Sequence, residues 1–321
     1  MSPERPRPRL VVTQQLPEPV EARITRDYDA LLNTAEVAFT PEQWLERCRD
    51  RDGMICTPLA DKLSADVIAR LPASLRIIAT FSVGYNHIDI AAARARGIIV
   101  TNTPGVLTDA TADLTWLLLL GAARRASEGE AIMRARSWTT KLLGTHVSGK
   151  ALGIVGMGRI GAAVARRAAG FGMQVHYLSR SAKALPDLPD AQCHTSEESF
   201  WPRCEFLSIH LPLNAQTRGF LNARRIAQLP RGAIVVNTAR GDIVDDDALI
   251  AALSDGQVGA AGLDVYTNEP NFRPEYAALK NTFLLPHLGS ATLETRRAMG
   301  YKVLENLDAF FAGREPPNRI P

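Results

Sequence analysis

The sequence predicts an α/β protein built from two doubly wound parallel-sheet domains. Short β-rich runs alternate with amphipathic helical stretches through the first hundred residues, a rhythm typical of parallel sheets. A linker containing proline and glycine follows at residues 101–105, and a second alternating pattern begins at Lys150. With 321 residues, 46% of them hydrophobic, the chain is large enough for two separate cores.

The first alternating pattern assigns strands and helices to the first domain. Strands are expected at residues 10–13, 36–39, 54–57, 76–81 and 98–100, and helices at 41–49, 64–71 and 88–96. Ser64 is suited to cap the second of these helices, with Asp66 in its first turn, and Gly97 suits the position just past a helix end.

The second pattern follows a long helix expected at residues 109–126, whose apolar residues occupy more than one face and therefore predict burial. A helix is expected at 159–170, and strands are expected at 151–155, 173–178, 206–210, 233–237, 259–264 and 282–285. The last helix, residues 293–311, has no strand after it, so we expect it to pack back onto the first domain.

A glycine fingerprint, GMGRIG at residues 156–161, lies between a continuous apolar strand and a helix. In a Rossmann unit the first glycine allows a tight turn, the second lets the backbone approach a pyrophosphate, and the third lets helix and strand pack closely. A turn without a ligand is the competing interpretation, but a helix N-terminus facing the phosphates favours dinucleotide binding. The expected contacts are Gly156, Gly158, Arg159, Ile160 and Gly161.

The residues after the second strand of this unit indicate which dinucleotide binds. Enzymes that use NAD normally place Asp or Glu about 20 residues beyond the glycines, on the ribose 2′-hydroxyl. Here the chain reads Ser179, Arg180, Ser181. A guanidinium and two hydroxyls suit a 2′-phosphate, so NADPH is the expected cofactor, with NADH possible. The alternative is that Arg180 is an ordinary exposed loop arginine. Asp187 lies too far along to replace the missing acid convincingly.

Hydride exchange with a carbonyl requires a proton carrier, a partner that orients this carrier, and a cation that binds a carboxylate. The second half of the chain contains three residues that can supply these groups. They are His287 in LPHLGS, Glu269 in NEP and Arg240 in NTARG. Taken singly, each has an ordinary explanation: a histidine at a strand end, a helix cap or loop acid, and a surface charge.

Together, the segments GMGRIG, VVNTARGDIVDDDAL, AAGLDVYTNEP and LLPHLGSAT resemble the D-2-hydroxyacid dehydrogenase family, and SVGYNHIDI and TPGVLTDATADL match it in order. The resemblance covers the chain from about Met54 onward. Within the family, the chain looks most like the NADP-preferring glyoxylate and hydroxypyruvate reductases, including those that also reduce 2-ketogluconate.

The resemblance implies two Rossmann-like domains with the active site in the interdomain cleft. One is a discontinuous, flavodoxin-like substrate-binding (catalytic) domain of residues 1–103 plus 291–321. The other is an inserted NAD(P)-binding Rossmann domain of residues 104–290. The resemblance also implies a homodimer built largely on the cofactor domains.

The reaction that the resemblance implies is reduction of a small 2-keto acid to the D-2-hydroxy acid with hydride from NADPH (EC 1.1.1.-). In it, Arg240 binds the substrate carboxylate, His287 protonates the carbonyl oxygen, and Glu269 orients the imidazole and favours its protonated form. This allocation is chemically sound, because a guanidinium binds a carboxylate through two hydrogen bonds and histidine exchanges protons near neutral pH.

Further positions match by motif. Val83 and Gly84 in SVGY match a loop whose backbone amides approach the substrate carboxylate, with a plain turn after a strand as the competing interpretation. The positions matched near the nicotinamide and its ribose are Thr111, Thr238, Ala239, Asp264, Gly289 and Ser290. Asn86 stands where relatives often have Asp. Trp138 corresponds to a region that reaches the neighbouring subunit's active site in some relatives, and an aromatic buried in its own subunit is the equal alternative.

Composition disfavours several other classes of function. The net charge of +3, from 37 basic and 34 acidic residues spread along the chain, gives no basic block for nucleic acid or membrane binding, so a small-molecule partner is expected. The four cysteines form no CxxC pair, and no cluster has metal-ligand spacing. No apolar run is long enough to span a bilayer and the start lacks a signal peptide's apolar core, so we expect a cytoplasmic protein.

Two alternatives to this function remain open. One is a family reaction on another 2-hydroxy acid or on phosphite; formate oxidation is less favoured, because that branch uses Gln where this chain has Glu269. The other is a cofactor-sensing, corepressor-like binding protein. Such a protein can retain the three catalytic residues, but no basic face or long interaction tail supports it.

Overall fold

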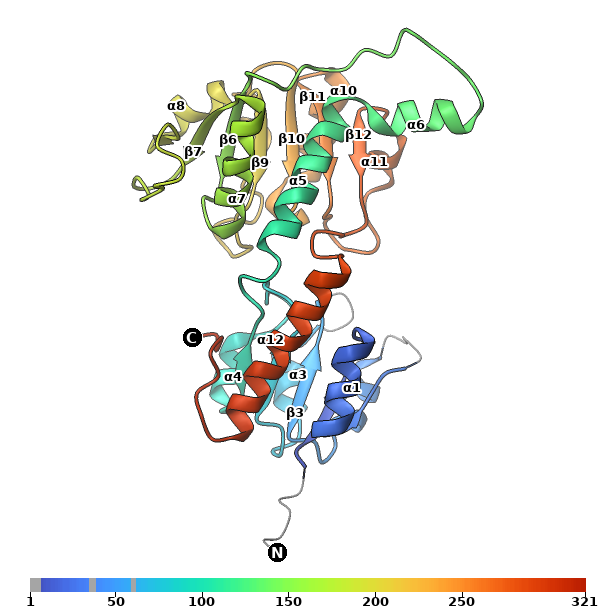
Figure 1. Ribbon diagram of the computed structural model, residues 1–321, viewed down its shortest axis with the longest axis vertical. Helices are drawn as coiled ribbons and strands as arrows, with labels where there is room; N and C mark the ends of the chain where they lie inside the picture. Colours follow the sequence, from blue (N-terminus) through green and yellow to red (C-terminus); the bar gives the residue numbers. More distant parts are fainter. Residues whose placement is uncertain (1–6, 35–38, 59–61) are drawn as a thin grey trace, which may run out of the picture. The chain divides into compact units, whose positions relative to one another are not determined.

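The computed structural model describes residues 7–34, 39–58 and 62–321. The chain divides into two compact units, which we call unit 1 (Met1–Leu107 with Ala291–Pro321) and unit 2 (Thr108–Ser290). Each unit contains one sheet (Figure 1). Every pair of neighbouring strands described in these sheets is parallel. The expectation of two parallel-sheet α/β domains is confirmed.

The sheet of unit 1 has the strand order β2-β1-β3-β4-β5, the flavodoxin-like doubly wound order. Its strands are β1 (Arg9–Val12), β2 (Asp29–Leu31), β3 (Gly53–Cys56), β4 (Ile77–Thr80) and β5 (Ile99–Thr101). The central strands β3 and β4 are buried at every residue. Both faces of the sheet are therefore covered, which is why these strands read as continuous apolar runs.

The helices of unit 1 are α1 (Glu18–Asp27), α2 (Pro41–Arg47), α3 (Ala65–Arg70), α4 (Ile90–Ala95) and α12 (Leu293–Phe311). Trp44 of α2, Ile68 of α3 and Ala93 of α4 share one core cluster on one face of the sheet. On the other face α12 packs on β4 and on α1 (Figure 1). The expected packing of the last helix onto the first domain, the Ser64 cap (3.4 Å to the Val67 N–H) and the left-handed Gly97 (φ +67°) are confirmed.

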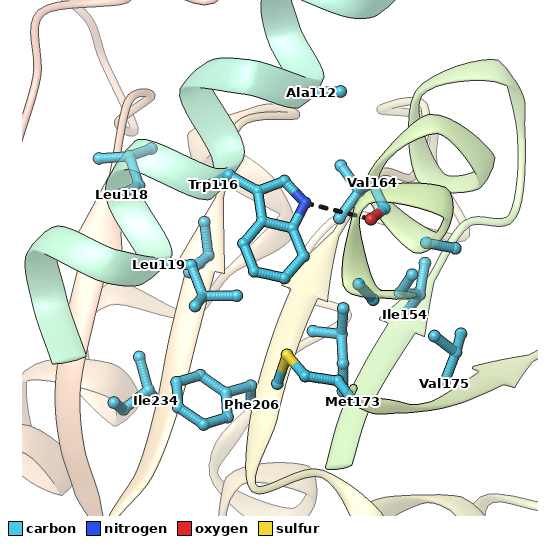
Figure 2. Packing of buried hydrophobic residues seen from close by; sticks show 14 of the residues in the cluster. Ala112, Trp116, Leu118, Leu119, Ile154, Val164, Met173, Val175, Phe206 and Ile234 are labelled. Atoms are coloured by element: carbon cyan, nitrogen blue, oxygen red, sulfur yellow. Dashed lines mark hydrogen bonds between the residues drawn. The ribbon is translucent and has the colours of Figure 1, made fainter. Parts of the chain in front are cut away.

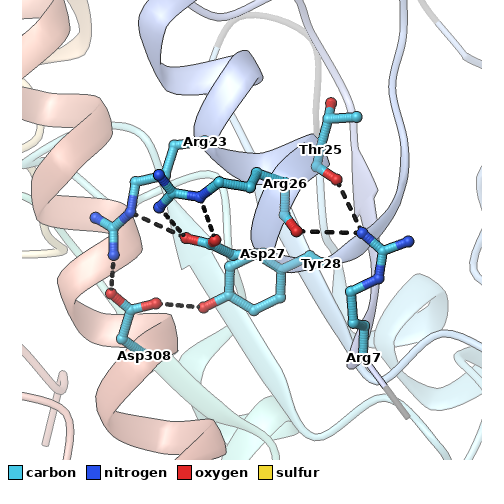
Figure 3. A network of polar contacts seen from close by, with 7 residues as sticks. All are labelled: Arg7, Arg23, Thr25, Arg26, Asp27, Tyr28 and Asp308. Carbon is cyan, nitrogen blue, oxygen red and sulfur yellow. Dashed lines mark hydrogen bonds and ion pairs between the residues drawn. The ribbon is translucent and has the colours of Figure 1, made fainter. Parts of the chain in front are cut away.

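A polar network ties α1 to α12 (Figure 3). Asp308 of α12 accepts hydrogen bonds from the Arg23 guanidinium and, at 2.6 Å, from the Tyr28 hydroxyl. Burial and the Asp308 carboxylate both raise the pKa of Tyr28. The hydroxyl therefore stays a donor, and the network links segments 280 residues apart in the chain.

The sheet of unit 2 has the order β12-β11-β10-β9-β6-β7-β8. Its strands are β6 (Ala151–Val155), β7 (Gln174–Leu178), β8 (Gln192–His194), β9 (Phe206–Ile209), β10 (Ala233–Asn237), β11 (Val258–Leu263) and β12 (Thr282–Leu284). The first strand of the unit, β6, lies between β7 and β9, so the strand order reverses there. Ligands of open α/β sheets bind at the carboxyl ends of the strands beside such a switch point.

The helices of unit 2 cover both faces of this sheet. They are α5 (Thr108–Ala123), α6 (Ala126–Arg134), α7 (Arg159–Ala168), α8 (Glu197–Phe200), α9 (Ala223–Ile226), α10 (Asp246–Asp255) and α11 (Pro274–Ala278), with single 3₁₀ turns η1 (Ala169–Phe171), η2 (Trp201–Arg203) and η3 (Gly241–Ile243). On one face, the Trp116 indole of α5 donates to the Val164 carbonyl of α7 at 3.1 Å above a core of β-strand side chains (Figure 2). A second core cluster, which includes Trp201, Leu249 and Tyr276, covers the opposite face.

One expected strand falls mostly outside the described residues, and one expected helix ends early. Residues 36–38 of the strand expected at 36–39 lie outside the described residues, and Phe39 is in no strand; the edge strand is β2, whose Asp29 and Ala30 give no β signal. The helix expected at 109–126 ends at Ala123, because the Ala123 carbonyl accepts the Thr145 N–H at 2.7 Å and Arg125 is left-handed (φ +54°). Within the described ranges, no helix has the length and apolar character needed to cross a membrane.

Candidate active site

The glycine turn between β6 and α7 is shaped by close backbone contacts. Gly156 is left-handed (φ +97°), and a Cβ there would lie 2.5 Å from the carbonyl carbon of His210. A Cβ at Gly161 would lie 2.3 Å from the Gly156 carbonyl oxygen. A Cβ at Gly158 would meet nothing within 4 Å. Two glycines are thus required by packing, and the middle one leaves open space beside the backbone.

That open space lies at the N-terminus of α7. Gly158 is the N-cap residue and supplies no side-chain cap to the first-turn amides of Arg159, Ile160 and Gly161. Uncapped amides together with the positive end of the helix dipole suit an anion. The residues present therefore fit a dinucleotide pyrophosphate.

The segment after β7 contains one arginine, Arg180, whose charge is unpaired among the described residues. The Ser179 N–H donates to the His194 carbonyl at 3.0 Å, while Arg180 and Ser181 are exposed. The Arg180 guanidinium has no hydrogen bond or ion pair to any part of the chain that the structure describes. Asp187 pairs with Arg166 at 3.4 Å, so its carboxylate is already engaged. This arrangement leaves Arg180 available for an anionic ligand.

His287 and Glu269 form a direct pair, with Nδ1 of the imidazole 2.6 Å from Oε2 of the carboxylate. A carboxylate only accepts, so Nδ1 carries the proton and Nε2 faces away from the pair. The other carboxylate oxygen accepts the Tyr266 N–H at 2.7 Å. Burial acts to raise the pKa of Glu269, but the bonds from His287 and Tyr266, with the charge of Arg240, outweigh it, and that pKa lies below its ordinary value.

Asp264, at the carboxyl end of β11, fixes the loop that carries His287. Its carboxylate accepts the N–H groups of Leu288 at 2.6 Å and Gly289 at 2.8 Å, and its carbonyl accepts the His287 N–H at 2.8 Å. Burial raises the pKa of Asp264 to about 6 against the opposing effect of these bonds. Thr111 adds a bond from its hydroxyl to the Gly289 carbonyl at 3.0 Å. The left-handed backbone of His287 (φ +57°) is thus held from several sides.

Arg240 follows β10 in a turn shaped by Asn237. The Asn237 side chain donates to the Arg240 carbonyl at 2.9 Å and accepts the Ala239 N–H at 2.9 Å. The buried Thr238 hydroxyl lies 3.0 Å from that of Thr115. Burial lowers the pKa of Arg240, and the negative charge of Glu269 opposes that shift. The guanidinium and the histidine–carboxylate pair thus influence one another electrostatically.

The expected residues fall into two groups. Arg240, Glu269, His287 and all the expected cofactor contacts belong to unit 2, whereas Val83 and Gly84 follow β4 in unit 1. The Val83 carbonyl accepts from the Asn102 side chain at 2.8 Å, and the Gly84 carbonyl accepts from the Ser82 hydroxyl at 2.6 Å. The N–H groups of Val83 and Gly84 have no acceptor within residues 7–34, 39–58 and 62–321. A loop that offers two unpaired donors suits a carboxylate.

Several supporting residues were not anticipated from the sequence. Asn237 lies inside the segment that identified Arg240, and its ability to form a side-chain turn was the available signal. Asn102 lies in a segment read only as a linker. Arg296, in the first turn of α12, has its guanidinium 5.8 Å from the centre of the Phe81 ring and no described polar partner. Nothing in the sequence pattern distinguished it from Arg297.

Trp138 is 78% exposed, so the interpretation of an aromatic buried in its own subunit is wrong. Met133 and Leu143, on either side of it in the chain, are 57% and 77% exposed. No residue of α6 is buried. In the part of the chain that is described, no group of three or more His, Cys, Asp or Glu is arranged to hold a metal ion.

A glycine turn at the switch point of a parallel sheet and a histidine–carboxylate pair on the same sheet are features of nicotinamide-dependent oxidoreductases. Residues 116–289 match the family described as D-isomer specific 2-hydroxyacid dehydrogenase, NAD binding domain. The chain is 41% identical to the glycerate dehydrogenase of Hyphomicrobium methylovorum over 96% of this chain and 97% of the relative. It is 41% identical to the glyoxylate reductase of Thermococcus litoralis over 98% and 97%.

Among solved structures, the NADPH-dependent glyoxylate/hydroxypyruvate reductase of Sinorhizobium meliloti, in complex with NADP and malonate, superposes with a TM-score of 0.88 at 33% identity, covering 98% of this chain and 97% of that one. The chain belongs to the D-isomer specific 2-hydroxyacid dehydrogenase family.

Proposed function

We propose that this protein reduces a small 2-keto acid, namely glyoxylate, hydroxypyruvate or 2-ketogluconate, to the D-2-hydroxy acid with hydride from NADPH. The observation that carries the proposal is the His287–Glu269 pair. Its 2.6 Å bond fixes the proton on Nδ1 and leaves Nε2 without a partner among the described residues. An imidazole held in this way presents one nitrogen for proton exchange with a substrate.

Each residue then has one chemical task. The bound nicotinamide supplies the hydride. His287 gives the proton on Nε2 to the carbonyl oxygen, and Glu269 holds the ring through its bond to Nδ1. Arg240 binds the substrate carboxylate and polarises the carbonyl, while the N–H groups of Val83 and Gly84 bind the same carboxylate. In the oxidative direction His287 acts as the base.

For the cofactor, Ser179, Arg180 and Ser181 are proposed to bind the 2′-phosphate, so NADPH is preferred and NADH is the slower alternative. The pyrophosphate is assigned to the turn of Gly156, Gly158, Arg159, Ile160 and Gly161. The nicotinamide and its ribose are assigned to Thr111, Thr238, Ala239, Asp264, Gly289 and Ser290. The relative solved in complex with NADP supports this choice.

The same proposal extends to the organisation of the protein. Residues 1–103 with 291–321 are assigned to substrate binding, and 104–290 to cofactor binding. The exposed α6 and the following segment, with Met133, Trp138 and Leu143, are proposed to be covered by a second copy in a cytoplasmic homodimer, because exposed apolar residues grouped in this way are typical of interfaces.

The test is a set of initial rates of NADPH and NADH oxidation with glyoxylate, hydroxypyruvate, 2-ketogluconate and pyruvate. We expect turnover that is faster with NADPH and is lost in His287→Ala. The exposed His146 offers a matched control, His146→Ala, that should keep the wild-type rate. A clear preference for NADH would contradict the role of Arg180, and no turnover with any acid would contradict the proposed reaction.

A further inference from the structure

Asn102, between β5 and α5, belongs to a set of bonds that reach the loop of Val83 and Gly84. Its Nδ2 donates to the Val83 carbonyl at 2.8 Å. The N–H of the next residue, Thr103, donates to the Ser82 carbonyl at 2.9 Å. The Ser82 hydroxyl donates to the Gly84 carbonyl at 2.6 Å. Three consecutive carbonyls of the loop are therefore bonded from within unit 1.

These bonds set the direction of the loop's amide N–H groups. In a planar trans peptide the N–H points away from the C=O, and both peptides here are trans. The bond to the Ser82 carbonyl therefore orients the Val83 N–H, and the bond from Asn102 to the Val83 carbonyl orients the Gly84 N–H. Both N–H groups are turned away from residues 102–103, and neither has an acceptor in the described parts of the chain.

Asn102 is itself held by α12 and by the segment after it. The fully buried Asn306 donates from Nδ2 to the Asn102 carbonyl at 3.3 Å, and the Asn102 N–H donates to the Asn318 carbonyl at 3.2 Å. The Asn306 Oδ1 accepts both the backbone N–H (3.0 Å) and the side-chain N–H (3.2 Å) of Asn318. These bonds hold the backbone of Asn102 on both sides, at a position from which its amide reaches the Val83 carbonyl.

We propose that Asn102 is a positioning residue for the carboxylate of the 2-keto acid. It acts through the Val83–Gly84 peptide, whose N–H it directs at the anion, and Asn306 and Asn318 keep it in place. The proposal rests on the proposed function, because it takes that carboxylate as the ligand of the loop. Nothing else in unit 1 bonds the Val83 carbonyl among the described residues, so loss of the Asn102 amide frees this peptide to rotate.

The test compares Asn102→Ala with Asn281→Ala in the full-length protein. Asn281 is a matched control, because its Nδ2 also donates to backbone carbonyls, those of Leu253 and Gly259, but in unit 2. Steady-state rates with glyoxylate at saturating NADPH give KM and kcat, and fluorescence titration gives the Kd for NADPH. We expect KM for glyoxylate to rise about tenfold in Asn102→Ala, with a much smaller change in kcat and an unchanged Kd for NADPH.

Asn102→Asp is a second variant for the same test, because it replaces the amide with a carboxylate of nearly the same size. It places a carboxylate oxygen against the Val83 carbonyl, so KM should rise further than in Asn102→Ala. An unchanged KM in both variants would overturn the positioning role. A lowered Tm together with equal losses of kcat and of NADPH affinity would also overturn the role. Such a result would show that Asn102 only stabilises the fold. Wild-type protein inactive with every 2-keto acid would overturn the proposed function and this role together, whereas active wild type beside a normal Asn102→Ala would overturn the role alone.

Discussion

The loop that carries His287 in unit 2 and the loop after β4 in unit 1 both lie at the carboxyl ends of parallel strands, but their polar groups are bonded differently. In unit 2, the polar groups there bond one another: His287 with Glu269, and Asp264 with the amides of Leu288 and Gly289. In unit 1, the carbonyls of the loop after β4 are bonded from within the unit, and the N–H groups of Val83 and Gly84 have no described acceptor. Around His287 the polar groups of unit 2 are bonded to one another, whereas the loop after β4 in unit 1 presents open donors.

The two arrangements are suited to different chemical tasks. A group that transfers a proton must hold one orientation and one tautomer, which requires bonds to its own neighbours. A group that recognises an anion must keep its donors unpaired until the anion arrives. Under the proposed function, unit 2 supplies the proton transfer, the cofactor site and Arg240, and the loop of unit 1 adds two N–H donors for the substrate carboxylate.

The largest expected effect comes from removing the proton carrier of unit 2. His287→Asn should lower kcat by about a thousandfold, because no other group replaces Nε2. The Kd for NADPH should stay unchanged in a fluorescence titration. The exposed His146 provides the control His146→Asn, which should match wild type. A kcat within a few-fold of wild type in His287→Asn would remove the histidine from the mechanism.

Glu269→Gln should cost less, about a hundredfold in kcat, because the imidazole remains but its partner no longer carries charge. The same variant tests the pH dependence of stability. The pKa of Glu269 is below its ordinary 4.5, so its ionised form stabilises the fold above about pH 4.5, and this contribution is lost as the pH falls through the folded pKa.

The difference in unfolding free energy between wild type and Glu269→Gln should therefore shrink as the pH falls below about 4.5 in denaturant titrations. Glu294→Gln, a change at an exposed position, is the control. A difference that grew on acidification would contradict the bonding assigned to Glu269.

Gly158→Ala tests whether the open space at the glycine turn is used by a ligand. A Cβ at Gly158 meets no protein atom within 4 Å, and the same is true of Gly170. Both alanine variants should keep nearly the wild-type Tm, but only Gly158→Ala should weaken NADPH binding, by about tenfold or more, since its methyl group enters the space given to the pyrophosphate. Equal NADPH affinity in the two variants would place the cofactor elsewhere.

Arg180→Ala should change cofactor choice rather than chemistry. Loss of a charge-assisted bond to the 2′-phosphate should lower kcat/KM for NADPH by about tenfold and leave the value for NADH nearly unchanged. Lys183→Ala, at a nearby exposed position, is the control. An equal loss with both cofactors would show that Arg180 does not read the 2′-phosphate.

The smallest effect is expected in unit 1, away from the substrate loop. Asp308→Asn weakens the bonds to Arg23 and Tyr28 and should lower the unfolding free energy by about 1–2 kcal/mol, with kcat and KM unchanged. Glu46→Gln, which breaks the exposed Glu46–Arg49 pair, should change stability by less than about 1 kcal/mol. A change of KM in Asp308→Asn would show that this network and the substrate loop are coupled.

The sequence predicted the parallel sheets because short β-rich runs alternate with amphipathic helical stretches along the chain. It did not anticipate β2, because this strand is short and contains Asp29, and its pairing with β1 depends on neighbours distant in sequence. The helix expected at 109–126 ends at Ala123, which the sequence did not predict. The hydrogen bond from the Thr145 N–H to the Ala123 carbonyl is a tertiary contact, and a local sequence pattern does not predict such contacts.

For the candidate site, the sequence indicated the glycines, Arg240, Glu269 and His287, because the segments that contain them match one family when they are taken together. It did not indicate the residues that orient them. Asn237 and Asn102 act through bonds to backbone carbonyls, and such bonds depend on where the backbone lies after folding. Asn is also common in turns, so its type alone gives no signal.

The most direct test of the central claim follows the hydride itself. NADPH labelled with deuterium at C4, on one face and then on the other, is oxidised with hydroxypyruvate, and the glycerate is examined by mass spectrometry and chiral chromatography. The account predicts D-glycerate with one deuterium at C2 from one of the two labelled cofactors, and no such product with His287→Ala. Absence of deuterium at C2 from both labels, or an L-configured product, would contradict it.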